Sequence, residues 1–275
     1  MFLTKKAFAK IIIMAICYFI LGSSFLALAW LWHFFLEIDA GFLLIFGMAL
    51  YAVDVLIVFW GYYAEGKGKL INLGNQLVRK ELKPAAFIEK YLILKNSKDL
   101  VVNKPSVEVL QMVAIAYDAL DERENCLAVV DEMISAAKKP QKKAYAKLMK
   151  TSFLFSYGKV EEAESILGEI QKLKLDLMCY ASIDSILKSD RAKAMGDYKI
   201  VEAYNLKLLE RKFPKLDNLG ELVVRYNLGE IYEKMKDYEK AASYYQYCAN
   251  FGGDTAIKPA AKAKLENLQS VFGVC

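Results

Sequence analysis

The sequence predicts an all-α protein in which an N-terminal pair of transmembrane helices precedes an array of helical hairpins. Two long apolar runs lie within the first 63 residues. The rest of the chain repeats a pattern of small and apolar residues at intervals of 37 to 40 residues. Periods of this length are typical of helical repeat proteins. Prolines stand between the expected helices, where a missing N–H is tolerated.

Residues 11–63 are expected to form a transmembrane hairpin after a short basic N-terminus, residues 1–10. Residues 11–36 contain no charged side chain and residues 40–63 contain one, Asp54. About 20 apolar residues in a helix are enough to cross a bilayer. Lysines flank both ends of the hairpin, which places both termini in the cytoplasm. The prediction is therefore a multi-pass protein of the cell membrane, in contact with the lipid bilayer.

A cleaved secretory signal peptide is the alternative interpretation of this N-terminus. Ala27, Leu28 and Ala29 resemble a cleavage site after a basic start and an apolar stretch. However, the apolar run continues to Leu36 and is followed by a second run. A cleaved peptide does not explain that second run, so two spans are the preferred interpretation.

Asp54 is the residue whose expected position inside the bilayer requires an explanation. A carboxylate at that depth costs a few kcal/mol unless it is neutralised or paired. Tyr18 of the first span is expected at a similar depth, and a hydrogen bond between the two would satisfy Asp54 within the hairpin. A contact with a polar group of a partner membrane protein is the functional alternative.

Residues 64–272 are expected to form about five helical hairpins, closed by a capping helix from about residue 258. A small residue occupies the eighth position of each hairpin, where its two helices would approach closely: Gly74, Ala114, Thr151, Ser189 and Gly229. Apolar residues recur at helical spacing in residues 259–272, with lysines on the other face. Such a helix would cover the apolar face that the last hairpin exposes.

The last hairpin resembles the tetratricopeptide repeat family. Its sequence reads Tyr-Asn-Leu-Gly-Glu-Ile-Tyr over residues 226–232 and Asp-Tyr-Glu-Lys-Ala-Ala over residues 237–242, with a second match at residues 158–164. The resemblance covers residues 67–272 and implies a right-handed α-solenoid that binds other proteins. The repeats are longer than the 34 residues of the family and lack its large aromatic residue at position 4. A less regular α-solenoid with longer helices is the alternative.

The resemblance also implies a partner groove, because the first helix of each hairpin lines the concave face in this family. The middle of that face would be apolar and aromatic, formed by Tyr145, Leu148, Ser152, Phe155, Ile183, Ile186 and Tyr226. An apolar groove favours a protein partner that supplies an apolar or amphipathic segment. Packing of the protein's own capping helix into the groove is the alternative.

A basic run begins at one junction between repeats and contains Lys138, Lys139, Lys142 and Lys143. We expect it to be a solvated face or, beside a membrane, a contact with anionic lipid headgroups. Nucleic acid is not an expected partner. The net charge is only +5 and no aromatic residues are interleaved with these lysines.

No catalytic, metal or cofactor site is expected. The single histidine, His33, leaves no histidine for a catalytic triad in residues 64–272, and no P-loop is present. The five cysteines show no CxxC spacing. The sequence therefore predicts a membrane-tethered scaffold that presents a cytoplasmic array for protein–protein interactions. The alternative is an accessory subunit of a membrane transport or secretion complex, with contacts through the transmembrane hairpin.

Overall fold

The computed structural model places the described residues in two compact units. One comprises Met1–Leu70 and Ile93–Pro105, and the other comprises Ile71–Leu92 and Ser106–Cys275. The structure describes residues 2–4, 9, 12–14, 16–17, 20, 23–24, 27, 31, 52–53, 68–97, 100–103, 105–171 and 175–272. The described part of the first unit includes a pair of antiparallel strands, β1 (Phe2–Thr4) and β2 (Leu100–Asn103).

The prediction of a multi-pass membrane protein is corrected by the helices that the structure describes. None of them is both long and apolar enough to cross a membrane. The two longest, α6 (Pro140–Ser156) and α11 (Asn218–Lys234), have 17 residues each and carry several charged side chains. A span requires about 20 predominantly apolar residues. Most residues of the predicted spans, 11–36 and 40–63, lie outside the described residues. Asp54 and Tyr18 also lie outside them.

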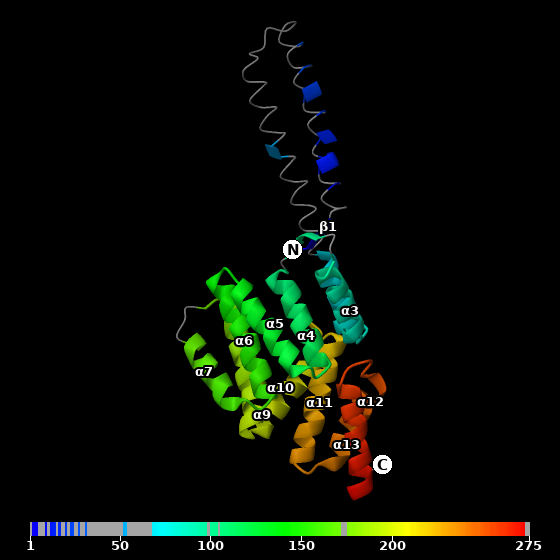
Figure 1. Cartoon of the computed structure of the whole chain (residues 1–275). Coiled ribbons are helices and arrows are strands. Elements are labelled where there is room, and N and C mark those ends of the chain that lie inside the picture. The colour runs from blue at the N-terminus through cyan, green and yellow to red at the C-terminus, as the bar shows by residue number, and fades with distance from the viewer. Residues whose placement is uncertain are drawn as a thin grey trace. The chain divides into compact units, whose positions relative to one another are not determined.

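The second unit is helical, in agreement with the predicted all-α class (Figure 1). Residues 68–74 are helical and continue into a π-helical turn, η1 (Asn75–Lys80). The remaining helices, besides α6 and α11, are α3 (Pro84–Lys95), α4 (Val107–Ala119), α5 (Arg123–Ala136), α7 (Val160–Gln171), α8 (Leu177–Ile186), α9 (Ala192–Met195), α10 (Tyr198–Glu210), α12 (Tyr238–Phe251) and α13 (Ile257–Phe272). A second π-helical turn, η2 (Leu187–Arg191), joins α8 to α9.

Helices that follow one another in the sequence pack against one another in the second unit. The pairs α4–α5, α6–α7 and α11–α12 form hairpins, and each of α5, α10 and α12 also packs on the helix that follows it (Figure 1). The C-terminal helix α13 packs on both α12 and α11. It therefore covers the last hairpin, at the position where the sequence predicts a capping helix.

Local sequence signals determine where these helices begin and end. The carboxylate of Asp217 accepts a hydrogen bond from the amide of Gly220 and caps α11, and Asp176 caps α8 in the same way through the amide of Cys179. Pro140 stands in the first turn of α6, where its missing N–H costs nothing. Gly196 ends α9 with a φ of 82°, which glycine adopts without strain.

The small residues at the eighth repeat position lie where two helices approach closely. Gly74, Ala114, Thr151 and Gly229 are buried, and Ser189 is partly buried in η2. A Cβ atom added to Gly229 would lie 2.7 Å from a ring carbon of Tyr245. A Cβ atom added to Gly74 would lie 2.2 Å from the side chain of Met112. The size of this residue therefore limits how closely neighbouring helices can pack.

Contacts between distant segments tie the beginning of the second unit to its end. The amide of Asp254 donates to the carbonyl of Leu82 at 2.8 Å, and the amide of Ala256 donates to the carbonyl of Ala119 at 2.9 Å. The guanidinium of Arg79 pairs with Asp217 at 2.7 Å. The turn after α12 is thus bound to the turn before α3 and to the end of α4.

Candidate functional site

Four of the seven side chains predicted to line a concave groove belong to the hydrophobic core. The exposed fractions of Leu148, Phe155, Ile183 and Ile186 are 1%, 3%, 8% and 4%. All four belong to one cluster, which α6, α7 and α8 build together. These four side chains therefore pack the helices against one another, and little of their apolar surface is exposed to a partner.

Of the other three predicted groove residues, Tyr145 and Ser152 contact a neighbouring hairpin, and Tyr226 contacts the partner helix of its own hairpin. The hydroxyl of Tyr145 accepts a hydrogen bond from the amide nitrogen of Gln111 at 3.1 Å. Ser152 donates to Asp190. The ring of Tyr226 lies against that of Tyr245, with 5.6 Å between the ring centroids. The first two contacts therefore join neighbouring hairpins, and the third joins the two helices of the last hairpin.

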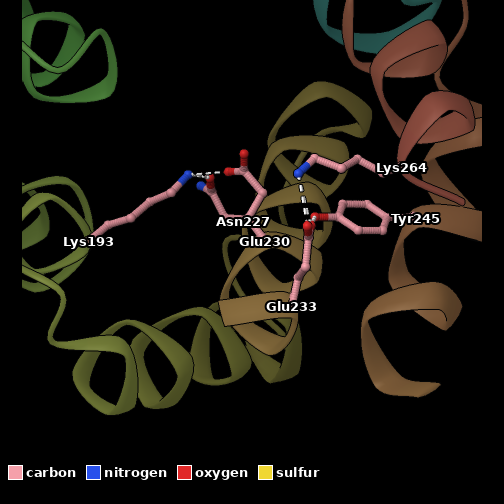
Figure 2. A network of polar contacts seen from close by, with 6 residues as sticks. All are labelled: Lys193, Asn227, Glu230, Glu233, Tyr245 and Lys264. Carbon is pink, nitrogen blue, oxygen red and sulfur yellow. Dashed lines mark hydrogen bonds and ion pairs between the residues drawn. The ribbon is translucent and has the colours of Figure 1, made fainter. Parts of the chain in front are cut away.

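The polar network continues along α11 to the capping helix (Figure 2). Lys193 of α9 donates to the side-chain oxygen of Asn227 at 2.7 Å and pairs with Glu230. Glu233 accepts a hydrogen bond from the hydroxyl of Tyr245 at 2.7 Å and another from Lys264 of α13 at 3.0 Å. Two ion pairs, Lys193–Glu230 and Lys264–Glu233, therefore join α11 to α9 and to α13.

Burial perturbs the acidity of several carboxylates in this network. Burial raises the pKa of Asp190 to about 6, against the lowering effect of Ser152 and Lys193. Burial also raises the pKa of Asp118, which accepts a hydrogen bond from Tyr157 at 2.7 Å. At Glu233 burial is outweighed, because hydrogen bonds from Tyr245 and Lys264 lower the pKa. No group of three or more potential ligands that could hold a metal ion occurs among the described residues.

The candidate site is a groove between α8 and α10, with a volume of about 1020 Å³. Its lining comes from α8, from Lys188 of η2, and from α10 with its C-cap Arg211. The lining residues are Ala181, Asp184, Lys188, Lys199, Ile200, Ala203, Tyr204, Lys207, Leu208, Glu210 and Arg211. None of these residues belongs to the groove that the family resemblance predicts.

Several exposed apolar side chains lie in the segment from α8 to the end of α10 and just after it, and one of them, Ile200, lines the groove. Leu177, Tyr180, Met195, Ile200 and Phe213 have exposed fractions of 86%, 55%, 47%, 50% and 89%. In α10 itself only Val201 and Asn205 are buried, although most of the helix is apolar. An apolar surface of this kind usually marks an interaction site.

Asn205 gives a sequence signal for this groove. In the repeat alignment it occupies the position of Val130, Leu167 and Tyr245, which are buried apolar residues in their own hairpins. Asn205 is itself only 1% exposed, and its side-chain nitrogen has no hydrogen-bond partner among the described residues. The fourth hairpin therefore lacks the apolar anchor that the second, third and last hairpins have at this position, and the first hairpin, with Lys90 there, lacks it as well.

The predicted basic run lies on an exposed surface at the start of α6. Lys138, Lys139, Lys142 and Lys143 are all exposed. Lys142 pairs with Glu108 of α4 at 2.6 Å. The run is thus partly engaged in a contact between hairpins.

Comparisons with known proteins give no relative from which a function can be transferred. No family model, no curated protein and no solved structure matches this chain. A function can therefore be proposed only from the residues of this chain and their arrangement.

Proposed function

We propose that the protein is a scaffold for protein–protein interactions, built as an α-solenoid related to tetratricopeptide repeat proteins. Paired helices in sequence order, small residues at the close contacts and a C-terminal covering helix support this architecture. In this proposal the protein works by binding, without a catalytic step. Its binding surface is the groove between α8 and α10.

The exposed apolar surface of the fourth hairpin is the observation that carries this proposal. Ile200 lies in the floor of the groove and is 50% exposed, and the residue at the same repeat position in the last hairpin is a charged residue, Lys240. From Lys199 to Arg211 the lining follows α10 and its C-cap over about 18 Å. A surface of this length suits a segment of another protein better than a compact small molecule.

Site-specific photo-crosslinking in the native cell tests this function. A photoreactive phenylalanine analogue would replace Ile200 in the full chain. The control would carry it at Val271 of α13, which is also apolar and 62% exposed. We expect a discrete crosslinked protein from position 200 and none from position 271. Equal products from both positions, or no product from either, would show that the fourth hairpin is not a selective binding surface.

A further inference from the structure

We infer that the groove between α8 and α10 binds an acidic amphipathic helix of a partner protein. The inference rests on the proposed scaffold function and adds the chemistry of the partner. Two properties of the groove carry it: the apolar floor and the excess of positive charge at its rim.

The floor provides room and apolar contact for one face of a helix. Ile200, Tyr204 and Leu208 follow one another at spacings of four residues along α10. Ala181 of α8 and Ala203 of α10 are both exposed, and their short side chains leave the space between the larger residues unfilled. An incoming helix that carries apolar residues at spacings of three and four would fill this space.

The rim carries four cationic side chains and two carboxylates. One cation and one carboxylate neutralise each other, because Lys188 of η2 pairs with Asp184 of α8 at 2.7 Å. Lys199 and Lys207 have no carboxylate partner among the described residues. The groove therefore favours a partner whose polar edge is acidic.

The spacing of the two lysines specifies the partner further. Lys199 and Lys207 are eight residues apart on one helix, which separates them by about 12 Å along its axis. A helix lying along α10 would meet both with carboxylates seven or eight residues apart. The partner pattern is thus two acidic residues separated by two turns, beside an apolar stripe.

An extended peptide fits the groove less well than a helix. Strand addition requires an exposed backbone edge, and this groove is lined by side chains of two helices. Helical backbones pair internally, so they offer no such edge. The side chains of the floor are the surface that remains for recognition.

A second copy of the chain is a less suitable occupant. The acidic helix α7 is the obvious donor of carboxylates within the chain. Three of its glutamates are already paired, with distances of 3.6 Å from Glu162 to Lys150, 2.5 Å from Glu164 to Arg191 and 2.9 Å from Glu169 to Lys147. Binding through α7 would break these ion pairs.

Fluorescence anisotropy with the purified full-length protein tests the inference. The probe is a labelled synthetic helix of about 14 residues, long enough to span the groove. It carries leucines at spacings of three and four and glutamates seven residues apart. A second probe has lysine in place of each glutamate. We expect the acidic probe to bind at least tenfold more tightly than the basic probe in titrations to about 1 mM.

Charge reversal provides the decisive comparison. The double variant K199E/K207E is expected to reverse the preference, so that the basic probe binds more tightly. The matched control K143E/K262E reverses two exposed lysines outside the groove and should bind like the unmodified protein. The helical circular dichroism of all variants should be unchanged, because Lys199 and Lys207 make no ion pair with a described carboxylate.

The alternative outcomes separate this inference from the proposed function. Equal binding of both probes, abolished by Ile200→Asp but not by K199E/K207E, would overturn acidic recognition and keep the scaffold. Absence of binding, with a crosslink at position 200 to a second copy, would make the occupant another protomer and overturn the inference. Absence of both binding and crosslinking would overturn the inference and the scaffold function together.

Discussion

The last hairpin, α11–α12, and the fourth hairpin, α8 to α10, differ in how their second helices, α12 and α10, are packed. In the last hairpin Tyr245 is fully buried, lies against Gly229 and donates to Glu233. In the fourth hairpin the corresponding residue is Asn205, and the apolar residues beside it line an exposed groove. In the last hairpin the helices pack tightly around Tyr245, and in the fourth hairpin an apolar surface beside Asn205 stays exposed.

The last hairpin is covered by another helix, whereas the fourth hairpin contains a buried polar group without a partner among the described residues. In the last hairpin α13 packs on α12, and Lys264 of α13 donates a hydrogen bond to Glu233 of α11. The fourth hairpin leaves the side-chain nitrogen of Asn205 without a partner among the described residues, which costs stability. We infer that the last hairpin contributes mainly to stability and the fourth mainly to binding.

Truncation of a tyrosine in each hairpin should give the largest difference. Tyr245→Ala removes a fully buried ring and a hydrogen bond, so we expect the free energy of unfolding to fall by about 3–5 kcal/mol. Tyr204→Ala removes a partly exposed ring from α10 and should cost less than about 1 kcal/mol. Chemical denaturation of both variants measures this. Similar losses would mean that α10 is packed as firmly as α12.

Substitutions at the anchor position should change stability in opposite directions. Leu167→Asn places an amide in the core of the third hairpin, where Leu167 is 2% exposed, and should cost about 3 kcal/mol. Asn205→Leu removes a buried nitrogen that has no partner and should stabilise the protein by about 1 kcal/mol. Thermal unfolding of the two variants checks the signs. A loss of stability in Asn205→Leu would show that the amide has a role in packing.

The sequence predicts local features of this molecule better than contacts between distant residues. The helical class and the position of α13 follow from periodicity, prolines and small residues, all of which act within a few turns. The contacts of Leu82 with Gly253 and Asp254 join residues whose sequence neighbours show no matching signal. The family pattern predicts only which face of a helix a residue occupies, and it therefore predicts Tyr145 and Phe155 on the concave face. Burial also depends on the curvature of the whole array, which the pattern does not specify.

The turn that joins the two ends of the second unit should be the next most sensitive site. Gly253 has a φ of 56°, and a Cβ atom there would lie 2.6 Å from the carbonyl oxygen of Leu82. Gly253→Ala should therefore cost about 2 kcal/mol and speed hydrogen exchange at the amide of Asp254. Gly158→Ala is the matched control, because its φ is 77° but no atom lies within 4 Å of the added Cβ. Equal costs for the two variants would mean that the contact with Leu82 adds nothing.

The smallest expected effect concerns the pH dependence of the network around Asp190. Burial raises the pKa of this carboxyl from its ordinary value of 3.8 to about 6, so the folded state binds the proton more tightly than the unfolded chain. Stability should therefore decrease as pH rises from about 4 to about 6, because the unfolded chain releases its proton first. Asp118, Lys193 and Ser152 also act on this carboxyl.

Asp190→Asn removes the titration and isolates this contribution. The stability of the unmodified protein, minus that of Asp190→Asn, should fall by on the order of 1 kcal/mol between pH 4 and pH 6. The full linkage value of the shift would be larger, but the side chain keeps some contact with solvent. Urea denaturation at several pH values measures the difference. A difference that rises over this interval would mean that Ser152 and Lys193 stabilise the charged carboxylate more than burial destabilises it. The contacts of Asp190 would then favour its charged form, as the contacts of Glu233 do. The two hairpins would then differ only at the groove.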